Sequence, residues 1–209
     1  MGLSEAQLRA DLDALAAIEP RIAAALARVG YPPTRIRVRG HVTLMRTIVG
    51  QQVSVKAADA MWRKLTEVVG VEADLERIAR ASDEELRAAG MSRQKSGYLR
   101  SLADEVTSGR LDFDHLPEDD EEAIAKLVQV KGIGRWSAEI YLLFAEGRGD
   151  IWPAGDLAVQ IEVGRILGHD SRPSEKLTRE LAEPWRPYRG AAAIFTWHHY
   201  GAESDAMPV

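Results

Sequence analysis

The fold is decided by residues 127–138, Leu127-Val-Gln-Val-Lys-Gly-Ile-Gly-Arg-Trp-Ser-Ala138. Gly132 and Gly134 bracket one apolar residue between two stretches with helical periodicity. Two glycines at this spacing allow a tight turn with positive φ. The turn leads into a helix whose first N–H groups lack a partner within the helix. Such a corner suits one phosphate, because the donors and the helix dipole both favour an anion. The alternative is a purely structural turn with glycine as a C-cap.

The segments on both sides of this turn have helical patterns almost throughout. Leu8, Leu12 and Leu15 recur on one helix face, and residues 82–85, Ser-Asp-Glu-Glu, have the pattern of a capping box. No segment shows the sustained alternation of a strand, so we predict an all-α protein of about ten or more short helices. The expected helices cover residues 20–30, 41–51, 92–106, 118–128, 135–147, 156–167, 174–183 and 187–200, and others begin near residues 4, 54 and 82.

Composition excludes several classes of protein. The chain has 209 residues, of which 45% are hydrophobic and 28% charged, so wholesale disorder is excluded. It contains no cysteine, which excludes disulfides, cysteine-ligated zinc, iron–sulfur clusters and thiol nucleophiles. The apolar stretches are too short to cross a bilayer, and we expect a soluble intracellular protein with no membrane partner.

Charge is distributed unevenly along the chain. The formal net charge of −5 argues against a nucleic-acid-binding protein. However, residues 104–122 contain nine acidic residues and one basic residue, and the rest of the chain has 26 basic and 23 acidic residues. Residues 118–122 are expected to open a helix, where carboxylates complement the dipole. Because the local field attracts a phosphate backbone, the basic clusters matter more than the net charge. They lie at residues 35–41, 93–95, 131–135 and 186–189.

In this context the turn resembles the hairpin of the helix–hairpin–helix DNA glycosylases of base excision repair, most closely the 3-methyladenine DNA glycosylase II type. Four blocks in the same order carry the resemblance, which spans residues 42–200. They are residues 48–54 (IVGQQVS), 90–95 (GMSRQK), 130–138 (VKGIGRWSA) and 152–156 (WPAGD), the last followed by 184–190 (PWRPYRG) and Trp197.

The resemblance implies a fold and an activity. The fold would be two helical lobes with a cleft between them, one formed by residues 41–147 with the hairpin at about 127–138. The other would combine residues 1–40 and 148–209 and carry the catalytic aspartate, and residues 147–155, rich in glycine and proline, would be the hinge. The activity would be a monofunctional hydrolase that flips out alkylated bases, releases them and leaves an abasic site.

The family's catalytic aspartate corresponds to Asp156. This residue precedes a helical pattern, so an N-cap is its structural alternative. Hydrogen bonds from the helix start would keep the carboxylate ionised. An ionised carboxylate stabilises the positive charge that forms on the sugar and can activate water. An alkylated purine already carries positive charge and can leave without a second acid.

The family's base pocket corresponds to Trp136 and Trp197, whose rings would face a flipped cationic base. The family has a tyrosine one helical turn after Trp136, where this chain has Ile140, which predicts an altered or more open pocket. Bifunctional relatives carry a lysine nucleophile at the position of Trp136, and tryptophan cannot form a Schiff base. The resemblance therefore implies a monofunctional enzyme.

The family's DNA contacts correspond to Gln52 and to the hairpin residues Lys131, Gly132, Gly134, Arg135 and Ser137. Gln52 matches the residue that wedges into the gap left by the flipped base. A polar helix end is the alternative for Gln51 and Gln52, and a solvated side chain is the alternative for Lys131.

Cofactors and partners follow from the same resemblance. The backbone carbonyls of Val128, Val130 and Ile133 match those that hold a monovalent cation, Na⁺ or K⁺, and no other cofactor is expected. Adjacent His198 and His199 point in different directions on a helix, so we expect a surface or packing role for them rather than a metal site.

The expected partner is double-stranded DNA containing alkylated bases, bound by a monomer. The expected location is the cytoplasm at a bacterial nucleoid, or the nucleus of a eukaryote. Two alternatives are a non-catalytic helix–hairpin–helix DNA-binding module and a helical interaction protein. The module needs the hairpin but neither Asp156 nor an aromatic pocket.

Overall fold

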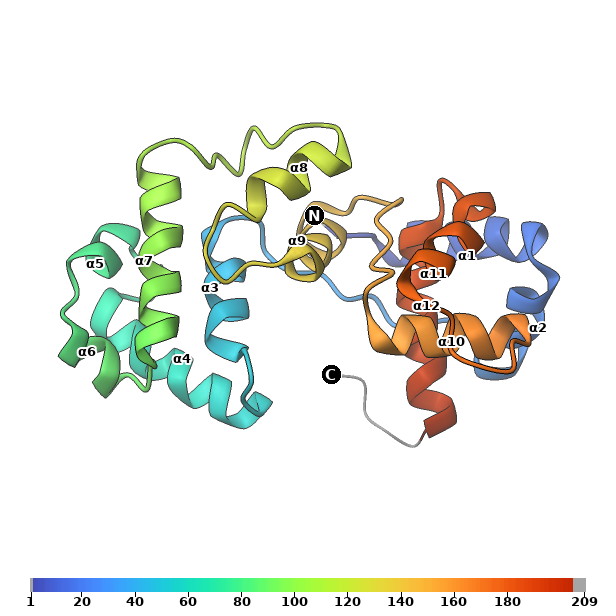
Figure 1. Cartoon of the computed structure of the whole chain (residues 1–209), viewed down its shortest axis with the longest axis horizontal. Helices are drawn as coiled ribbons and strands as arrows, with labels where there is room; N and C mark the ends of the chain where they lie inside the picture. Colours follow the sequence, from blue (N-terminus) through green and yellow to red (C-terminus); the bar gives the residue numbers. More distant parts are fainter. Residues whose placement is uncertain (1, 205–209) are drawn as a thin grey trace. The chain divides into compact units, whose positions relative to one another are not determined.

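The computed structural model describes residues 2–204, and these residues form helices, turns and loops without a strand (Figure 1). The predicted all-α class is therefore confirmed. The chain divides into two compact units. The central unit consists of residues 37–141, and the terminal unit combines residues 1–36 with residues 142–209. The central unit expected from the sequence was residues 41–147, so it begins four residues and ends six residues earlier than expected.

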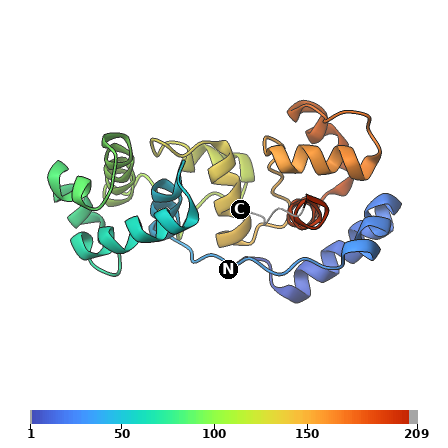
Figure 2. The same cartoon turned by 90° about the horizontal axis from the view of Figure 1, so that it is seen from below.

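The central unit is built around α7. Its helices are α3 (His41–Gly50), α4 (Val55–Val69), α5 (Leu75–Arg80), α6 (Asp83–Ala88), α7 (Arg93–Thr107), α8 (Asp120–Leu127) and α9 (Arg135–Tyr141). α7 packs against α3, α5 and α6, with Leu99 and Leu102 fully buried. Because α7 lies between these helices, it can present side chains to the ends of several of them (Figures 1 and 2).

The terminal unit is assembled from the two ends of the chain. It contains α1 (Glu5–Ile18), α2 (Pro20–Val29), α10 (Leu157–Leu167), α11 (Glu175–Leu181), the short 3₁₀ helix η2 (Glu183–Trp185) and α12 (Arg189–Ser204). α12 packs against α10, α1 and α2. Figure 2 shows α12 (red) along its axis with α10 (orange) crossing beside it. The packing brings residues near 160 next to residues near 197.

Polar caps explain where many of the helices begin. Ser4, Ser54, Ser82, Ser92 and Ser174 each accept a backbone N–H three residues later, which contributes about 1 kcal/mol per helix. The capping box predicted at residues 82–85 is present. Asp119 caps α8, whose first turn contains three acidic residues, as the acidic run predicted. These local signals therefore locate helix starts correctly.

The structure differs from the sequence prediction at two elements. The six-residue α5 was not expected, because one and a half turns are too short to show helical periodicity. The single helix expected over residues 135–147 consists of α9 followed by a π-helical turn, η1 (Leu142–Glu146). Among residues 2–204, no helix is both long and apolar enough to span a membrane.

Candidate functional site

Asp156 caps α10 and accepts two hydrogen bonds on one carboxylate oxygen. Its Oδ1 accepts from the backbone N–H of Val159 at 3.0 Å and from the indole Nε1–H of Trp197 at 3.1 Å. The second donor comes from α12, so two helices of the terminal unit converge on the carboxylate. Two N–H donors and the N-terminus of α10 therefore point at the carboxylate. The arrangement supplies a fixed negative charge beside an aromatic ring.

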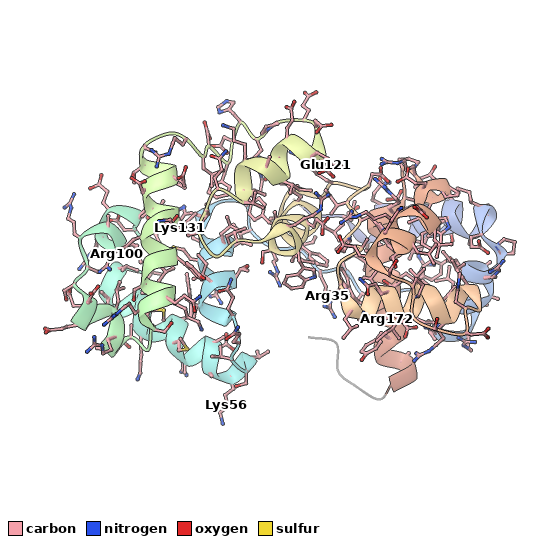
Figure 3. All side chains as sticks on the ribbon, viewed as in Figure 1. Arg35, Lys56, Arg100, Glu121, Lys131 and Arg172 are labelled. Carbon is pink, nitrogen blue, oxygen red and sulfur yellow. The ribbon has the colours of Figure 1, made fainter. Side chains whose placement is uncertain are left out.

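The loop that leads to Asp156 is held by hydrogen bonds from its surroundings. The indole of Trp152 donates to a backbone carbonyl of α11 at 3.0 Å. The amide of Gln160 donates to the carbonyl of Ala154 at 2.7 Å, and its oxygen accepts from Arg172 at 2.7 Å (Figure 3). These contacts fix the chain on both sides of the aspartate. The position of the carboxylate is therefore determined by buried packing and not by the loop alone.

A cluster of four charges ties the same loop to the start of α12. Arg189 donates to both carboxylate oxygens of Asp150, each at 2.8 Å, and to Glu183 at 3.0 Å. Arg186 also donates to Asp150 and Glu183. Two carboxylates thus balance two guanidinium groups. A phosphate that binds either arginine therefore has to compete with Asp150 and Glu183.

The surface next to Asp156 is apolar. The ring of Trp197 packs on Phe144, with ring centroids 5.7 Å apart. Leu157 directly follows the aspartate, and 58% of its surface is exposed. Sequence reasoning missed this residue, because a leucine in the first turn of a helix is ordinarily a core residue. An apolar side chain beside a carboxylate is suited to contact a sugar or a base.

The hairpin of the central unit joins α8 to α9 through residues 128–134. Gly132 has φ +85°, and a Cβ on it would lie 2.2 Å from the ring of Tyr98, so only glycine fits. The tight turn with positive φ that the glycines allow is made at Gly132, and Gly134 does not have positive φ. The space where its Cβ would lie is open. Gly132 therefore shapes the hairpin, and Gly134 leaves its backbone accessible.

The remaining hairpin residues lie on one short stretch. The N–H of Ile133, which is buried, donates to the carbonyl of Val130 at 3.0 Å. Val128 ends α8 and is 39% exposed, and Ser137 is half-buried in α9. Lys131 is exposed, and its backbone N–H donates to the hydroxyl of Ser101 in α7 at 3.0 Å (Figure 3). The hairpin is therefore hydrogen-bonded to α7.

Arg135 joins the two helices of the hairpin. It donates to both carboxylate oxygens of Glu121 in α8, at 2.8 and 2.5 Å, and to Glu139 in α9 at 2.9 Å. The hydrogen bonds to Glu121, more than any other contact, raise the pKa of Arg135 above its usual value. A phosphate that binds this guanidinium has to compete with Glu121.

The loop after α3 is tied to the hairpin. The side chain of Gln51 donates to the carbonyl of Gly132 at 2.8 Å. Gln52, which follows, is exposed and has a left-handed backbone with φ +55°. The buried ammonium of Lys95 donates to the carbonyl of Val49 at 2.7 Å. Sequence reasoning missed Gln51 and Lys95 as anchors, since both contacts join segments distant in the chain.

The predicted site residues divide between the two units. Asp156 and Trp197 meet in the terminal unit. Trp136, which is 45% exposed, and Ile140, which is buried, lie on α9 in the central unit, which also contains Gln52 and the hairpin. His199 is fully buried, in agreement with the packing role predicted for it. Within residues 2–204, no three histidine or carboxylate side chains are grouped to hold a metal ion.

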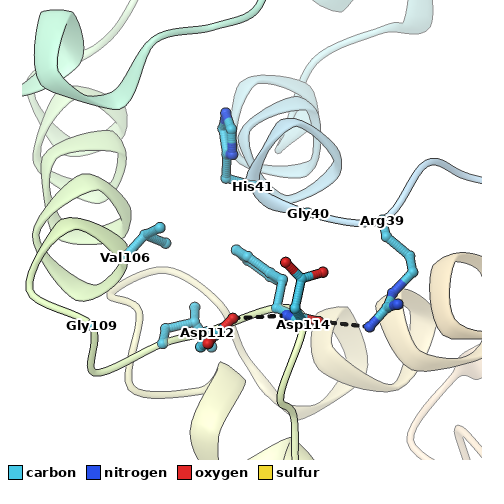
Figure 4. Close-up of a pocket in the computed structure, with 9 residues that line it drawn as sticks. Arg39, Gly40, His41, Val106, Gly109, Asp112 and Asp114 are labelled. Carbon is cyan, nitrogen blue, oxygen red and sulfur yellow. Dashed lines mark hydrogen bonds between the residues drawn. The ribbon is translucent and has the colours of Figure 1, made fainter.

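The central unit also contains a cavity of about 370 Å³ away from these residues (Figure 4). It lies between the start of α3 and the loop after α7, and its lining includes Arg39, His41 and Asp112. Arg39 donates to the carbonyl of Phe113 at 2.7 Å, and Asp112 accepts from the N–H of Asp114 at 2.9 Å. Arg39 is therefore bonded to the loop after α7, and Asp112 is bonded within that loop. None of the predicted site residues lines this cavity.

The fold and the site define a class, the DNA repair proteins built around a helix–hairpin–helix motif. The chain belongs to the HhH-GPD superfamily of base excision DNA repair proteins, whose family model matches residues 45–187. DNA-3-methyladenine glycosylase 1 of Schizosaccharomyces pombe is 32% identical over 158 residues, which cover 74% of this chain and 69% of that protein.

Two solved structures have the same fold. The DNA-3-methyladenine glycosidase of Bacillus halodurans matches with a TM-score of 0.86 and 31% identity, over 95% of this chain and 92% of that one. The 3-methyladenine DNA glycosylase Mag1 of S. pombe, in complex with abasic DNA, matches with a TM-score of 0.76 and 27% identity, over 93% and 96%. The chain spans 56–75% of the length of three curated relatives. The resemblance stated from the sequence is thereby confirmed.

Proposed function

We propose that this protein is a monofunctional DNA glycosylase that hydrolyses the N-glycosyl bond of alkylated bases of the 3-methyladenine type and leaves an abasic site. The observation that carries the proposal is the carboxylate of Asp156, held by Val159 and by the indole of Trp197. The relatives described above are named for the same reaction. The partner is duplex DNA, which acts as substrate in the cytoplasm of a bacterium or the nucleus of a eukaryote.

The reaction needs an anion more than it needs an acid. Cleavage of the bond between base and sugar leaves positive charge on the sugar, and the carboxylate of Asp156 stabilises that charge. The same carboxylate orients the attacking water and accepts its proton. An N-alkylated purine is already cationic, so it departs without protonation by a second carboxylic acid. One aspartate is therefore sufficient for the chemistry.

The tryptophan at the position of the bifunctional relatives' lysine makes the proposed enzyme monofunctional. Trp136 lies in the first turn of α9 and is 45% exposed. Its indole cannot form a Schiff base. Lys131 precedes the hairpin glycines and serves DNA binding in this proposal. Lys95 is buried against the carbonyl of Val49. Water is then the nucleophile, and the product is an abasic site with an intact strand.

DNA binding is proposed for the hairpin and for the loop after α3. The open backbone at Gly134 and the exposed ammonium of Lys131 would contact phosphate. Gln52 would fill the gap left by the flipped base, since its exposed side chain follows a residue anchored on the hairpin. Binding as a monomer is part of this proposal.

A monovalent cation at the hairpin is also part of the proposal. The carbonyls of Val128, Val130 and Ile133 would hold it, because backbone oxygens are hard ligands of the kind that Na⁺ and K⁺ accept. The cation would add positive charge near the bound phosphate and would take no part in base release. No iron–sulfur cluster is proposed, since the 209 residues include no cysteine.

The decisive variant is Asp156→Asn. It keeps the size of the side chain and can still cap α10, but it removes the negative charge. We expect the single-turnover rate of base release from alkylated duplex DNA to fall at least about a hundredfold, while affinity for an abasic duplex stays within about threefold of wild type. Base release by the variant at the wild-type rate would contradict the mechanism.

The wild-type protein provides the second half of the test. Release of no alkylated base from a panel of defined lesions, combined with tight duplex binding, would favour the non-catalytic DNA-binding module. No binding to duplex DNA at low salt would favour a helical interaction protein. The same panel would rank the alkylated bases as substrates.

A further inference from the structure

A continuous chain of hydrogen bonds crosses the core of the terminal unit. Arg28 of α2 contacts Nε2 of His199 at 2.7 Å, Nδ1 of His199 contacts a carboxylate oxygen of Glu162, and the other oxygen accepts from Arg165 at 2.6 Å. The side chains of His199 and Glu162 are 0% exposed. The network therefore runs from exposed Arg28 on α2, through buried His199 on α12 and buried Glu162 on α10, to exposed Arg165 on α10.

The partners fix the protonation of the ring. A guanidinium has only donors, so Nε2 of His199 is the acceptor of the contact with Arg28. Nδ1 then carries the proton and donates it to Glu162. Each buried polar atom of the two residues thus has a matched partner. These hydrogen bonds form together at one orientation of the imidazole ring and one rotation of α12 relative to α10.

Such a network is not the simplest way to fill a core. Burying a carboxylate and an imidazole is costly, and apolar residues of similar volume would often be as stable or more stable. A directional network of hydrogen bonds favours one relative orientation of the helices that it joins. Apolar side chains alone would tolerate small rotations of α12 far better than this chain of hydrogen bonds does.

The helices joined by this network are those that carry the candidate active site. Glu162 lies six residues after Asp156 on α10, and His199 lies two residues after Trp197 on α12. Side-chain atoms lie about 5 to 6 Å from a helix axis. A rotation of α12 by about 10° would therefore move the indole by about 1 Å. A displacement of that size would break the 3.1 Å contact between Trp197 and Asp156.

We propose that His199 and Glu162 are positioning residues of the reaction, which hold α12 at the rotation that places the indole of Trp197 on the carboxylate of Asp156. This inference rests on the proposed glycosylase function. Neither residue contacts the substrate in this proposal. Their effect on base release passes through Trp197, which donates to the carboxylate and orients it.

The test is a double-mutant cycle between His199→Leu and Trp197→Phe. His199→Leu removes both ring nitrogens, and Trp197→Phe keeps an aromatic ring but removes the indole donor. The readout is the single-turnover rate of base release from a duplex with one alkylated base. We expect His199→Leu alone to lower the rate about ten- to a hundredfold, because a misplacement of about 1 Å has effects of that size.

In the Trp197→Phe background we expect His199→Leu to lower the rate by less than about threefold, since the contact that it positions is already missing. His199→Asn is the conservative variant, because its amide can replace Nδ1–H as the donor to Glu162. It should recover most of the wild-type rate. Multiplicative effects of His199→Leu and Trp197→Phe, or no rescue by His199→Asn, would overturn the inference.

A fold control separates positioning from general damage to α12. Thr196 is the neighbouring buried residue, and its hydroxyl donates to the carbonyl of Ala193 within the helix at 2.8 Å. Thr196→Val should lower thermal stability without changing the rate by more than about twofold. Circular dichroism and binding to an abasic duplex check that each variant is folded. If Thr196→Val slows base release as much as His199→Leu, the inference is wrong.

A spectroscopic readout keeps the inference testable without activity. The indole ¹⁵N–¹H resonance of Trp197, assigned by its loss in Trp197→Phe, reports the hydrogen bond to Asp156. It should shift in His199→Leu and stay in place in Thr196→Val. If base release depends on Asp156 but this resonance does not shift, the positioning role fails and the proposed function stands. If wild type releases no base, the function fails and the resonance still tests the contact.

Discussion

Lys95 shows how a cationic residue can serve a DNA-binding hairpin without contact to DNA. Its ammonium donates to the carbonyl of Val49 in the last turn of α3, where a cation complements the negative end of the helix dipole. Gln51, two residues further, is bound to the hairpin carbonyl of Gly132. Lys95 therefore fixes the end of α3 from which the loop with Gln52 begins.

The burial of Lys95 predicts a pH dependence of stability. Burial lowers the pKa of Lys95 below its usual 10.5, so between the folded value and 10.5 the unfolded chain binds more protons than the folded chain. Stability contributed at this site therefore rises with pH across that interval. We expect the free energy of unfolding of wild type, minus that of Lys95→Met, to increase from pH 7 to pH 10 in urea titrations.

Subtracting the free energy of unfolding of Lys95→Met from that of wild type removes the contribution of other groups that titrate between pH 7 and pH 10. Lys131→Met is the matched control, because it makes the same replacement at an exposed position. A pH-independent difference for Lys95→Met would mean that its ammonium is solvated in the folded protein.

At the residue scale, sequence reasoning placed Asp156 correctly at the start of a helix but misjudged the environment of several cationic side chains. The aspartate precedes a helix, and its capping bond to Val159 depends only on neighbouring residues. Lys95 was grouped with exposed basic residues because its burial arises from packing of α7 on α3. Long-range packing of this kind leaves no local pattern in the sequence.

Among the secondary-structure elements, the two helices of the hairpin are joined by an ion pair that also controls a potential DNA contact. Arg135 is shared between Glu121 of α8 and Glu139 of α9. The side chain of Glu121 is 68% exposed, so its interaction with Arg135 is screened and contributes little to stability. Replacing Glu121 should therefore leave the fold intact and make the guanidinium available to phosphate.

We expect Glu121→Gln to raise the affinity for an abasic duplex about two- to fivefold at low salt, since one competing carboxylate is removed near the binding surface. Fluorescence anisotropy at 50 mM salt measures the effect. Glu122→Gln removes the same charge from the neighbouring position of α8 and should change affinity less. Equal gains for both variants would show that net charge matters and that the pairing with Arg135 does not.

Helix starts were more predictable than helix interiors and short elements. Serine and aspartate caps act within three residues, and they located α4, α6, α7 and α11. The π-helical turn after Tyr141 has no such local signal, because it depends on how Leu142–Glu146 pack in the terminal unit. α5 was missed because six residues give too few repeats of the pattern.

Across the whole molecule, internal pairing reduces the positive charge available to DNA. The arginines at 186 and 189 are balanced by Asp150 and Glu183, Lys95 is buried, and Arg135 is shared with Glu121. The basic clusters seen in the sequence therefore overstate the field at the surface. The order of residues in the chain shows where charges are, but tertiary contacts decide which of them act outward.

This pairing predicts a shallow salt dependence of DNA binding. With about three or four phosphates neutralised, the logarithm of the association constant should fall with the logarithm of salt concentration at a slope of about −3. Anisotropy titrations of an abasic duplex between 50 and 200 mM salt measure it. A slope near about −6 would mean that Arg135, Arg186 and Arg189 exchange their carboxylates for phosphates.

The division of the chain has a consequence for synthesis on the ribosome. The central unit is one continuous segment, whereas the terminal unit needs residues from before residue 37 and after residue 141. At about 5 to 20 residues per second, residues 142–209 take about 3 to 14 seconds to be translated. The hairpin is complete before Asp156 meets Trp197 of α12. A nascent chain can therefore form its hairpin before the contact between Asp156 and Trp197 exists.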